Sequence, residues 1–148
     1  MSVRYRETGA VHLDFHRTTN GTIAYLRQRY GVEFLDEILR RTARDVYRAI
    51  RADLMAGNPE HLLEHWTYFL TREGGQFTVE RSGTEIRVTV HRCPAAAYLR
   101  ARGIPLDPAF RRQTTVLNEA LGAGTPFEVT TEVIDDLRYI QTIRKRQP

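Results

Sequence analysis

The chain contains a single cysteine, and the residues around it are those that make a thiol reactive. Cys93 follows a segment in which apolar and polar residues alternate, as in a half-buried strand, and it precedes Pro94 and a run of alanines. Proline is favoured in the first turn of a helix, so the sequence predicts Cys93 at or beside a helix N-terminus. Unpaired N–H groups at that position favour a thiolate, and Arg92 adds positive charge. The alternative is a small buried residue that fills a strand–helix corner, which is the usual role of a free cysteine.

Two histidines near the start of the chain are candidate partners for this thiol. His12 and His16 are four residues apart, which places them on one side of a helix predicted over residues 13–30. A thiol needs a base to ionise it, and a leaving group needs a proton. We therefore predict Cys93, His16 and His12 as the catalytic residues.

The spacing His12-x-Asp14-x-His16 also raises the question of a metal site. On a helix only the two histidines converge, because Asp14 points away from the face they share. A metal site needs three or four converging ligands, and the chain has no second ligand pair at a recognised spacing. The sequence therefore predicts no metal, and the proposed chemistry requires no cofactor.

Further polar residues are predicted on the core-facing sides of helices, where several together indicate a pocket. Gln113 and Asn118 would orient a substrate or stabilise developing negative charge. Arg92 or Arg111 would bind a carboxylate through paired hydrogen bonds. The predicted substrate-binding residues are Asn20, His65, Arg92, Arg111, Gln113 and Asn118.

Helices and two hairpins must position these residues. The chain is long enough for one domain with a real core, over residues 1–148. Helices are predicted over residues 13–30, 33–55 and 59–72, then over a short segment ending at Gly103 and another starting at Asp107; strands are predicted over 76–81, 84–92, 126–134 and 138–145. This order predicts an α+β fold, in which helices pack on one face of a four-stranded antiparallel sheet of two hairpins. We expect Trp66 and Leu117 to be buried beneath that sheet.

Composition narrows the class of partner. The formal charge of +4 comes from arginines scattered among acids, so nucleic-acid binding ranks last among the functions considered. No apolar run is long enough to span a membrane. One cysteine excludes an internal disulfide, so we expect a reducing cytoplasm. The expected partner is a small molecule, and the formation of a homo-oligomer is left open.

Several stretches of the chain resemble the L-2-amino-thiazoline-4-carboxylic acid hydrolase family. They are His91–Leu99 (HRCPAAAYL), Asp107–Phe110 (DPAF), Arg112–Leu121 (RQTTVLNEAL) and His12–His16 (HLDFH) with the helix that ends at Arg29-Tyr30-Gly31. The resemblance spans nearly the whole chain, and the Cys-Pro corner is its most specific part. It implies hydrolytic opening of a cyclic thiazoline amino acid with Cys93 as the nucleophile. A weaker likeness is to the small ligand-binding domains of the V4R type.

The chain departs from this family at two positions. Family members often carry a second cysteine just after the position of Phe110 and a third near the final strand, where this chain has Arg111 and residues such as Leu137 or Tyr139. The first hypothesis is a hydrolase-like enzyme that acts on a small polar, carboxylate-bearing, amino-acid-derived substrate, and the resemblance implies thiazoline-type ring opening. The alternative hypothesis is a non-catalytic small-molecule-binding or sensor domain with the same pocket.

Overall fold

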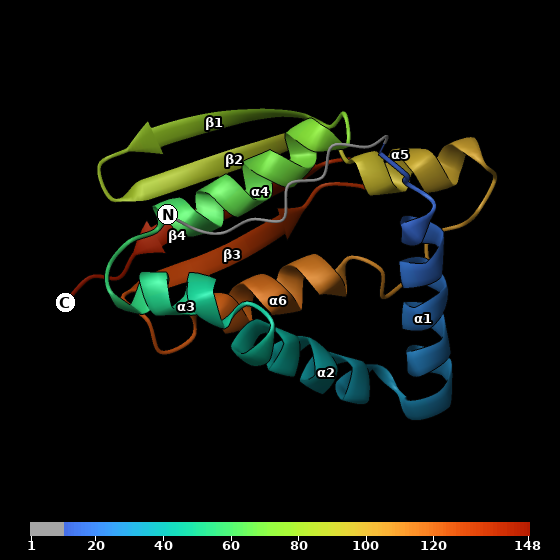
Figure 1. The fold of residues 1–148 in the computed structure, drawn as a ribbon, viewed down its shortest axis with the longest axis horizontal. Coiled ribbons are helices and arrows are strands. Elements are labelled where there is room, and N and C mark those ends of the chain that lie inside the picture. Colours follow the sequence, from blue (N-terminus) through green and yellow to red (C-terminus); the bar gives the residue numbers. More distant parts are fainter. Residues whose placement is uncertain (1–10) are drawn as a thin grey trace.

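A computed structural model describes residues 11–148, over which the chain forms six helices and one four-stranded sheet (Figure 1). The helices are α1 (Phe15–Tyr30), α2 (Val32–Asp45), α3 (Arg48–Met55), α4 (Glu60–Arg72), α5 (Pro94–Ala101) and α6 (Arg112–Gly122). The strands are β1 (Gln76–Ser82), β2 (Glu85–Arg92), β3 (Phe127–Val133) and β4 (Tyr139–Lys145). The predicted α+β class is confirmed.

The sheet consists of the two hairpins expected from the sequence. β1 pairs with β2 around a tight turn in which Gly83 takes a φ of 48°, and β3 pairs with β4 around residues 134–138. β2 and β4 join the hairpins, so the strand order is β1-β2-β4-β3 with all neighbours antiparallel. Glycine suits the first turn because left-handed backbone costs it nothing.

The two faces of the sheet differ as the period-2 pattern predicts. On one face Ile86, Val88 and Val90 of β2 are buried opposite Ile143, Gln141 and Tyr139 of β4. The other face carries an exposed ion pair in which Arg144 donates to Glu85 at 2.8 Å. The first face is therefore the floor of the core, and Gln141 is the polar residue in the middle of it.

Helices α4 and α6 pack on this floor, and α2 lies outside α6 (Figure 1). Trp66 of α4 is only 7% exposed, as predicted. Leu117 of α6 is half-buried rather than buried, because it lines a cavity. The cavity therefore lies within the layer between helices and sheet.

The helix predicted over residues 33–55 is two helices, α2 and α3. No glycine or proline separates them, so local sequence gives no sign of the break. At the junction Tyr47 turns toward the cavity while Val46 is 69% exposed. Ala43 before the break and Ile50 after it are both buried in the core.

Two ion pairs fasten the outer helices to the rest of the fold. Arg27 of α1 donates to Asp107 at 2.7 Å, and Arg112 of α6 donates to Asp36 of α2 at 2.6 Å. The hydrogen bond from Arg27 lowers the pKa of Asp107, and the one from Arg112 lowers the pKa of Asp36. Both pairs join segments that are far apart in the sequence, so they set the positions of α1 and α2.

These pairs predict a loss of stability in acid. The folded protein keeps Asp107 and Asp36 ionised to a lower pH than the unfolded chain does. Their contribution to the free energy of unfolding is therefore complete above the ordinary carboxyl pKa of about 3.9. It is lost as the pH falls through the lower folded-state values. We expect the urea midpoint to stay level from about pH 7 to 5 and to fall by about pH 3.

The matched variants are Asp107→Asn with Asp36→Asn, and Asp45→Asn at an exposed position of α2 as the control. The double variant should unfold at a lower urea concentration at neutral pH. Its urea midpoint should then fall less on acidification than that of the wild type. An identical acid loss in the double variant and the wild type would contradict this assignment.

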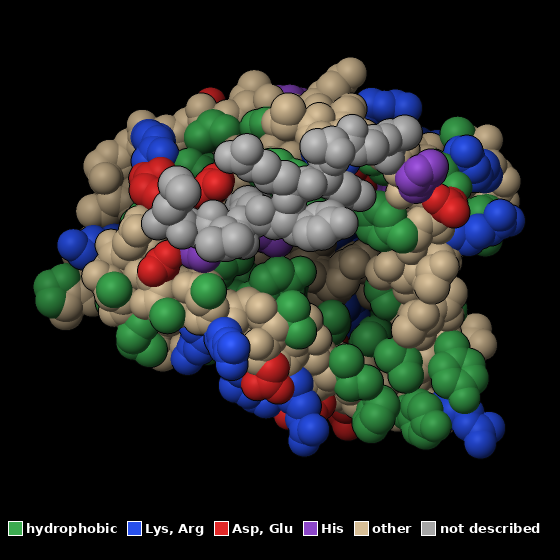
Figure 2. All heavy atoms as spheres, in the orientation of Figure 1, with side chains coloured by type: hydrophobic (Ala, Val, Ile, Leu, Met, Phe, Trp, Pro, Cys, Tyr) green, Lys and Arg blue, Asp and Glu red, His purple; other side chains and the backbone are tan. Residues whose placement is uncertain are grey.

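Hydrophobic side chains gather on the surface at the corner where α1 meets α2 (Figure 2). Tyr25, Tyr30 and Phe34 are about half exposed there, and the rings of Tyr30 and Phe34 lie 4.8 Å apart.

Among residues 11–148, none of the helices is both long and apolar enough to cross a membrane. The cytoplasmic location stays a prediction. The formation of a homo-oligomer stays open.

Candidate functional site

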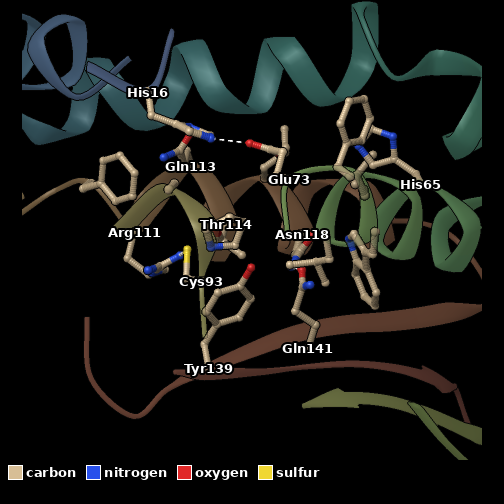
Figure 3. Close-up of a pocket in the computed structure, with 18 of the residues that line it drawn as sticks. His16, His65, Glu73, Cys93, Arg111, Gln113, Thr114, Asn118, Tyr139 and Gln141 are labelled. Atoms are coloured by element: carbon tan, nitrogen blue, oxygen red, sulfur yellow. Dashed lines mark hydrogen bonds and ion pairs between the residues drawn. The ribbon is translucent and has the colours of Figure 1, made fainter. Parts of the chain in front are cut away.

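A cavity of about 320 Å³ lies between the sheet and the helices (Figure 3). Its walls come from the start of α1, from α4 and α6, from the strand–helix corner before α5, and from β4. The volume is at the lower end of the range for small-molecule sites. The cavity is mainly apolar and carries a few inward-facing polar groups, which is the usual composition of a ligand pocket.

Cys93 stands at the N-cap of α5 and lines the cavity, as the sequence predicted. Its backbone is extended (φ −70°, ψ 120°), Pro94 begins the helix, and the Cys93 N–H donates to the carbonyl of Leu137 at 2.8 Å. The residue is only 4% exposed. The thiol therefore meets the cavity and not the bulk solvent.

Arg111 is the polar neighbour of the thiol. Its Nη1 lies 3.6 Å from Cys93 Sγ, and its Nη2 donates to the Asp136 carbonyl at 2.8 Å. The guanidinium also lies 4.5 Å from the centre of the Tyr139 ring. These contacts hold a fixed positive charge beside the sulfur.

His16 lines the same cavity but contacts a different group. Its Nε2 is hydrogen-bonded to Glu73, which follows the end of α4, and both side chains are nearly buried (Figure 3). No hydrogen bond joins Cys93 to a histidine among residues 11–148. The cysteine and the imidazole therefore face one space as a thiol–guanidinium pair and an imidazole–carboxylate pair.

His12 does not lie on the helix where the sequence placed it. The first helical hydrogen bonds run from His16 N to Leu13 O and from Arg17 N to Asp14 O, so α1 begins only at Phe15. His12 precedes that start, is exposed and does not line the cavity. Among the described residues, no three histidine, cysteine, aspartate or glutamate side chains gather as a metal site would require.

Asn20 and Arg92 also lie outside the cavity. Asn20 is buried, but its amide donates to the Pro105 carbonyl at 3.1 Å and accepts from the Asp107 N–H at 2.9 Å. It therefore fastens α1 to the loop before α6. Arg92 is exposed at the end of β2, where the pairing of β1 with β2 shifts register, and it does not line the cavity.

The remaining predicted residues do reach the cavity. Gln113 and Asn118 line it from α6, and His65 lines it from α4 between the rings of Tyr47 and Phe69, at 5.1 and 5.0 Å. Asn118 is 2% exposed and donates to Thr131 Oγ1 and to Gln141 Oε1, both at 2.8 Å. The cavity thus has a thiol–arginine end, an aromatic end and a buried amide pair.

Sequence reasoning missed several polar residues of this cavity, among them Glu73, Tyr139 and Gln141. Gln141 was detectable, since it falls between Tyr139 and Ile143 on the apolar side of a predicted strand. Glu73 gave no signal, because an acid before two glycines looks like an ordinary solvated helix end.

Tyr139 is a neutral phenol at the cavity wall. Burial raises its pKa strongly, and the nearby Cys93 acts in the same direction, while Arg111 opposes them. A buried phenol of this kind keeps its proton and offers an O–H donor.

Comparison with protein-family models, with curated proteins and with solved structures finds no match for this chain.

Proposed function

We propose that this protein is a hydrolase for a small, carboxylate-bearing, amino-acid-derived substrate, of the L-2-amino-thiazoline-4-carboxylic acid hydrolase type. The observation that carries the proposal is that the chain's one cysteine and an imidazole–carboxylate pair border the same cavity. The thiol supplies a nucleophile and the imidazole supplies proton transfer, which are the two functions that covalent hydrolysis requires.

Arg111 has two roles in this scheme. Its Nη1 lies 3.6 Å from Cys93 Sγ, so a positive charge adjoins the sulfur that attacks the substrate in this scheme. It is also the cavity-lining arginine nearest the nucleophile, so it attracts a substrate carboxylate to the reacting end. The two cysteine positions at which this chain departs from the resembled family correspond to Arg111 and the Leu137–Tyr139 region, and both of these adjoin Cys93.

The proposed reaction adds one water across a ring bond. The thiolate attacks the ring carbon that bears the amino group, and the ring carbon–nitrogen double bond passes its electron pair to the nitrogen, which takes a proton from solvent. The ring carbon–sulfur bond of the adduct then breaks while the amino nitrogen's electron pair forms a new carbon–nitrogen double bond, and His16 protonates the departing sulfur. Glu73 occupies Nε2 of His16, which leaves Nδ1 for this transfer. Water then attacks the covalent adduct and releases the thiol, and the neutral Tyr139 hydroxyl donates to developing negative charge.

A non-catalytic binding domain is the second candidate. It is favoured by one observation, namely that the polar partner of Cys93 is a guanidinium and not an imidazole. A carboxylate ligand could pair with Arg111 in the same cavity without any covalent step. This candidate requires no ionised thiol.

Alkylation of Cys93 separates the two candidates. With iodoacetamide at pH 7, we expect Arg111→Met to slow labelling about tenfold, because it removes the positive charge beside the sulfur. Each labelled molecule gains one adduct, since the chain has one cysteine, so intact-mass spectrometry gives the rate directly.

The matched control is Arg92→Met. Arg92 adjoins Cys93 in sequence but is exposed outside the cavity, so its removal should leave the labelling rate near that of the wild type. Equal rates in all three proteins would support the binding domain and remove the thiolate from the proposal.

A further inference from the structure

Asn118 and Gln141 each leave one polar side-chain atom at the cavity wall without a hydrogen-bond partner among residues 11–148. Asn118 Nδ2 makes both hydrogen bonds of its side chain, to Thr131 and Gln141, and these leave Asn118 Oδ1 and Gln141 Nε2 unpaired among residues 11–148. The two side chains are buried, at 2% and 3% exposure, and both line the cavity. A buried amide atom without a partner costs about 1–3 kcal/mol, so an unpaired donor and acceptor side by side need an explanation.

The arrangement does not depend on how the amides are oriented. If both amides are turned over, Gln141 donates to Asn118, and the unpaired atoms become Asn118 Nδ2 and Gln141 Oε1. In either orientation one donor and one acceptor remain. Figure 3 shows Gln141 extending from β4 to meet Asn118 from α6 in the middle of the cavity.

We propose that Asn118 and Gln141 recognise an amide or neutral amidine group of the substrate. Such a group carries an N–H donor beside a nitrogen or oxygen acceptor, and it satisfies both unpaired atoms at once. Arg111 stands at the thiol end of the same cavity, so the substrate class is a carboxylate that also carries an amide-like group. This inference rests on the proposed function for the position of the carboxylate.

Three compounds isolate the two recognition elements. L-2-Amino-thiazoline-4-carboxylic acid has both the amidine and the carboxylate, thiazolidine-4-carboxylic acid lacks the amidine, and 2-amino-thiazoline lacks the carboxylate. We expect calorimetric titration of the full-length Cys93→Ser protein to show that loss of the amidine weakens binding roughly 10- to 100-fold. The serine variant prevents turnover during the measurement.

Gln141→Met tests the amide pair, because methionine keeps the length of the side chain and removes both amide atoms. In this variant the dissociation constants of L-2-amino-thiazoline-4-carboxylic acid and thiazolidine-4-carboxylic acid should lie within about threefold of each other. Thr142→Val is the matched control, since Thr142 is the next residue of β4 and faces the opposite side of the sheet. It should keep the full preference for the amidine.

The outcomes separate this inference from the proposed function. An unchanged preference in Gln141→Met, equal binding of the two acids to the parent protein, or no binding of any compound would overturn the inference. If Gln141→Met does not fold, the Asn118→Leu and Gln141→Leu double variant, which leaves no buried amide, replaces it under the same criteria. A selective amidine preference in a protein that never hydrolyses the compound supports the inference and refutes the hydrolase.

Discussion

Replacing Cys93 with alanine is expected to reduce hydrolysis of L-2-amino-thiazoline-4-carboxylic acid by roughly 1,000-fold or more. The sulfur is the attacking atom of the proposed reaction, and the loss of a covalent nucleophile removes the pathway itself and not a single contact. The assay is mass spectrometry of a product one water heavier than the substrate. The Cys93→Ala protein should keep a melting temperature near that of the wild type, because the change removes one small atom from a corner.

The two histidines give the internal comparison. His16→Ala should lose about 100-fold or more of the activity, since His16 faces the cavity and would protonate the leaving atom. His12→Ala should be unaffected, since His12 is exposed and precedes α1. Full hydrolysis by Cys93→Ala would remove the cysteine from the mechanism and leave His16, Gln113 and Asn118 as the residues to test.

The hairpins were predictable because their signals are local. The alternation of Ile86, Val88 and Val90 with polar residues defines one face of β2, and Gly83 supplies the left-handed backbone of its turn. The Cys93–Pro94 corner was predictable for the same reason, since proline at the start of a helix is a preference of neighbouring residues. Each of these features depends on a few consecutive residues.

The partners of the site residues were not predictable, because they depend on contacts across the chain. The sequence suggested a cysteine–histidine pair, but Arg111 lies beside Cys93, and Glu73 is bonded to His16 from a helix end 57 residues away. Asn20 shows the same limit. Its place on an inward stripe was correct, but the stripe could not show that its amide would bind the backbone of a distant loop.

The second large effect is expected at Gly122, the last residue of α6. A Cβ built there would lie 2.9 Å from the backbone nitrogen of Val129 and 3.0 Å from the carbonyl oxygen of Phe127. Both atoms belong to β3, which cannot move away without disturbing its pairing with β4. We expect Gly122→Ala to lower the free energy of unfolding by about 2 kcal/mol, measured by urea denaturation.

Gly21→Ala is the matched control and should have the opposite sign. Gly21 lies within α1, its Cβ would meet no atom within 4 Å, and alanine in an open helical position stabilises by roughly 0.5–1 kcal/mol. Gly122 also connects stability to the site, because the close approach of α6 to β3 is what brings Asn118 within 2.8 Å of Thr131 and Gln141. A Gly122→Ala protein as stable as the wild type would mean that α6 and β3 can separate at little cost. The amide pair of Asn118 and Gln141 would then lack the rigid support that selective recognition requires.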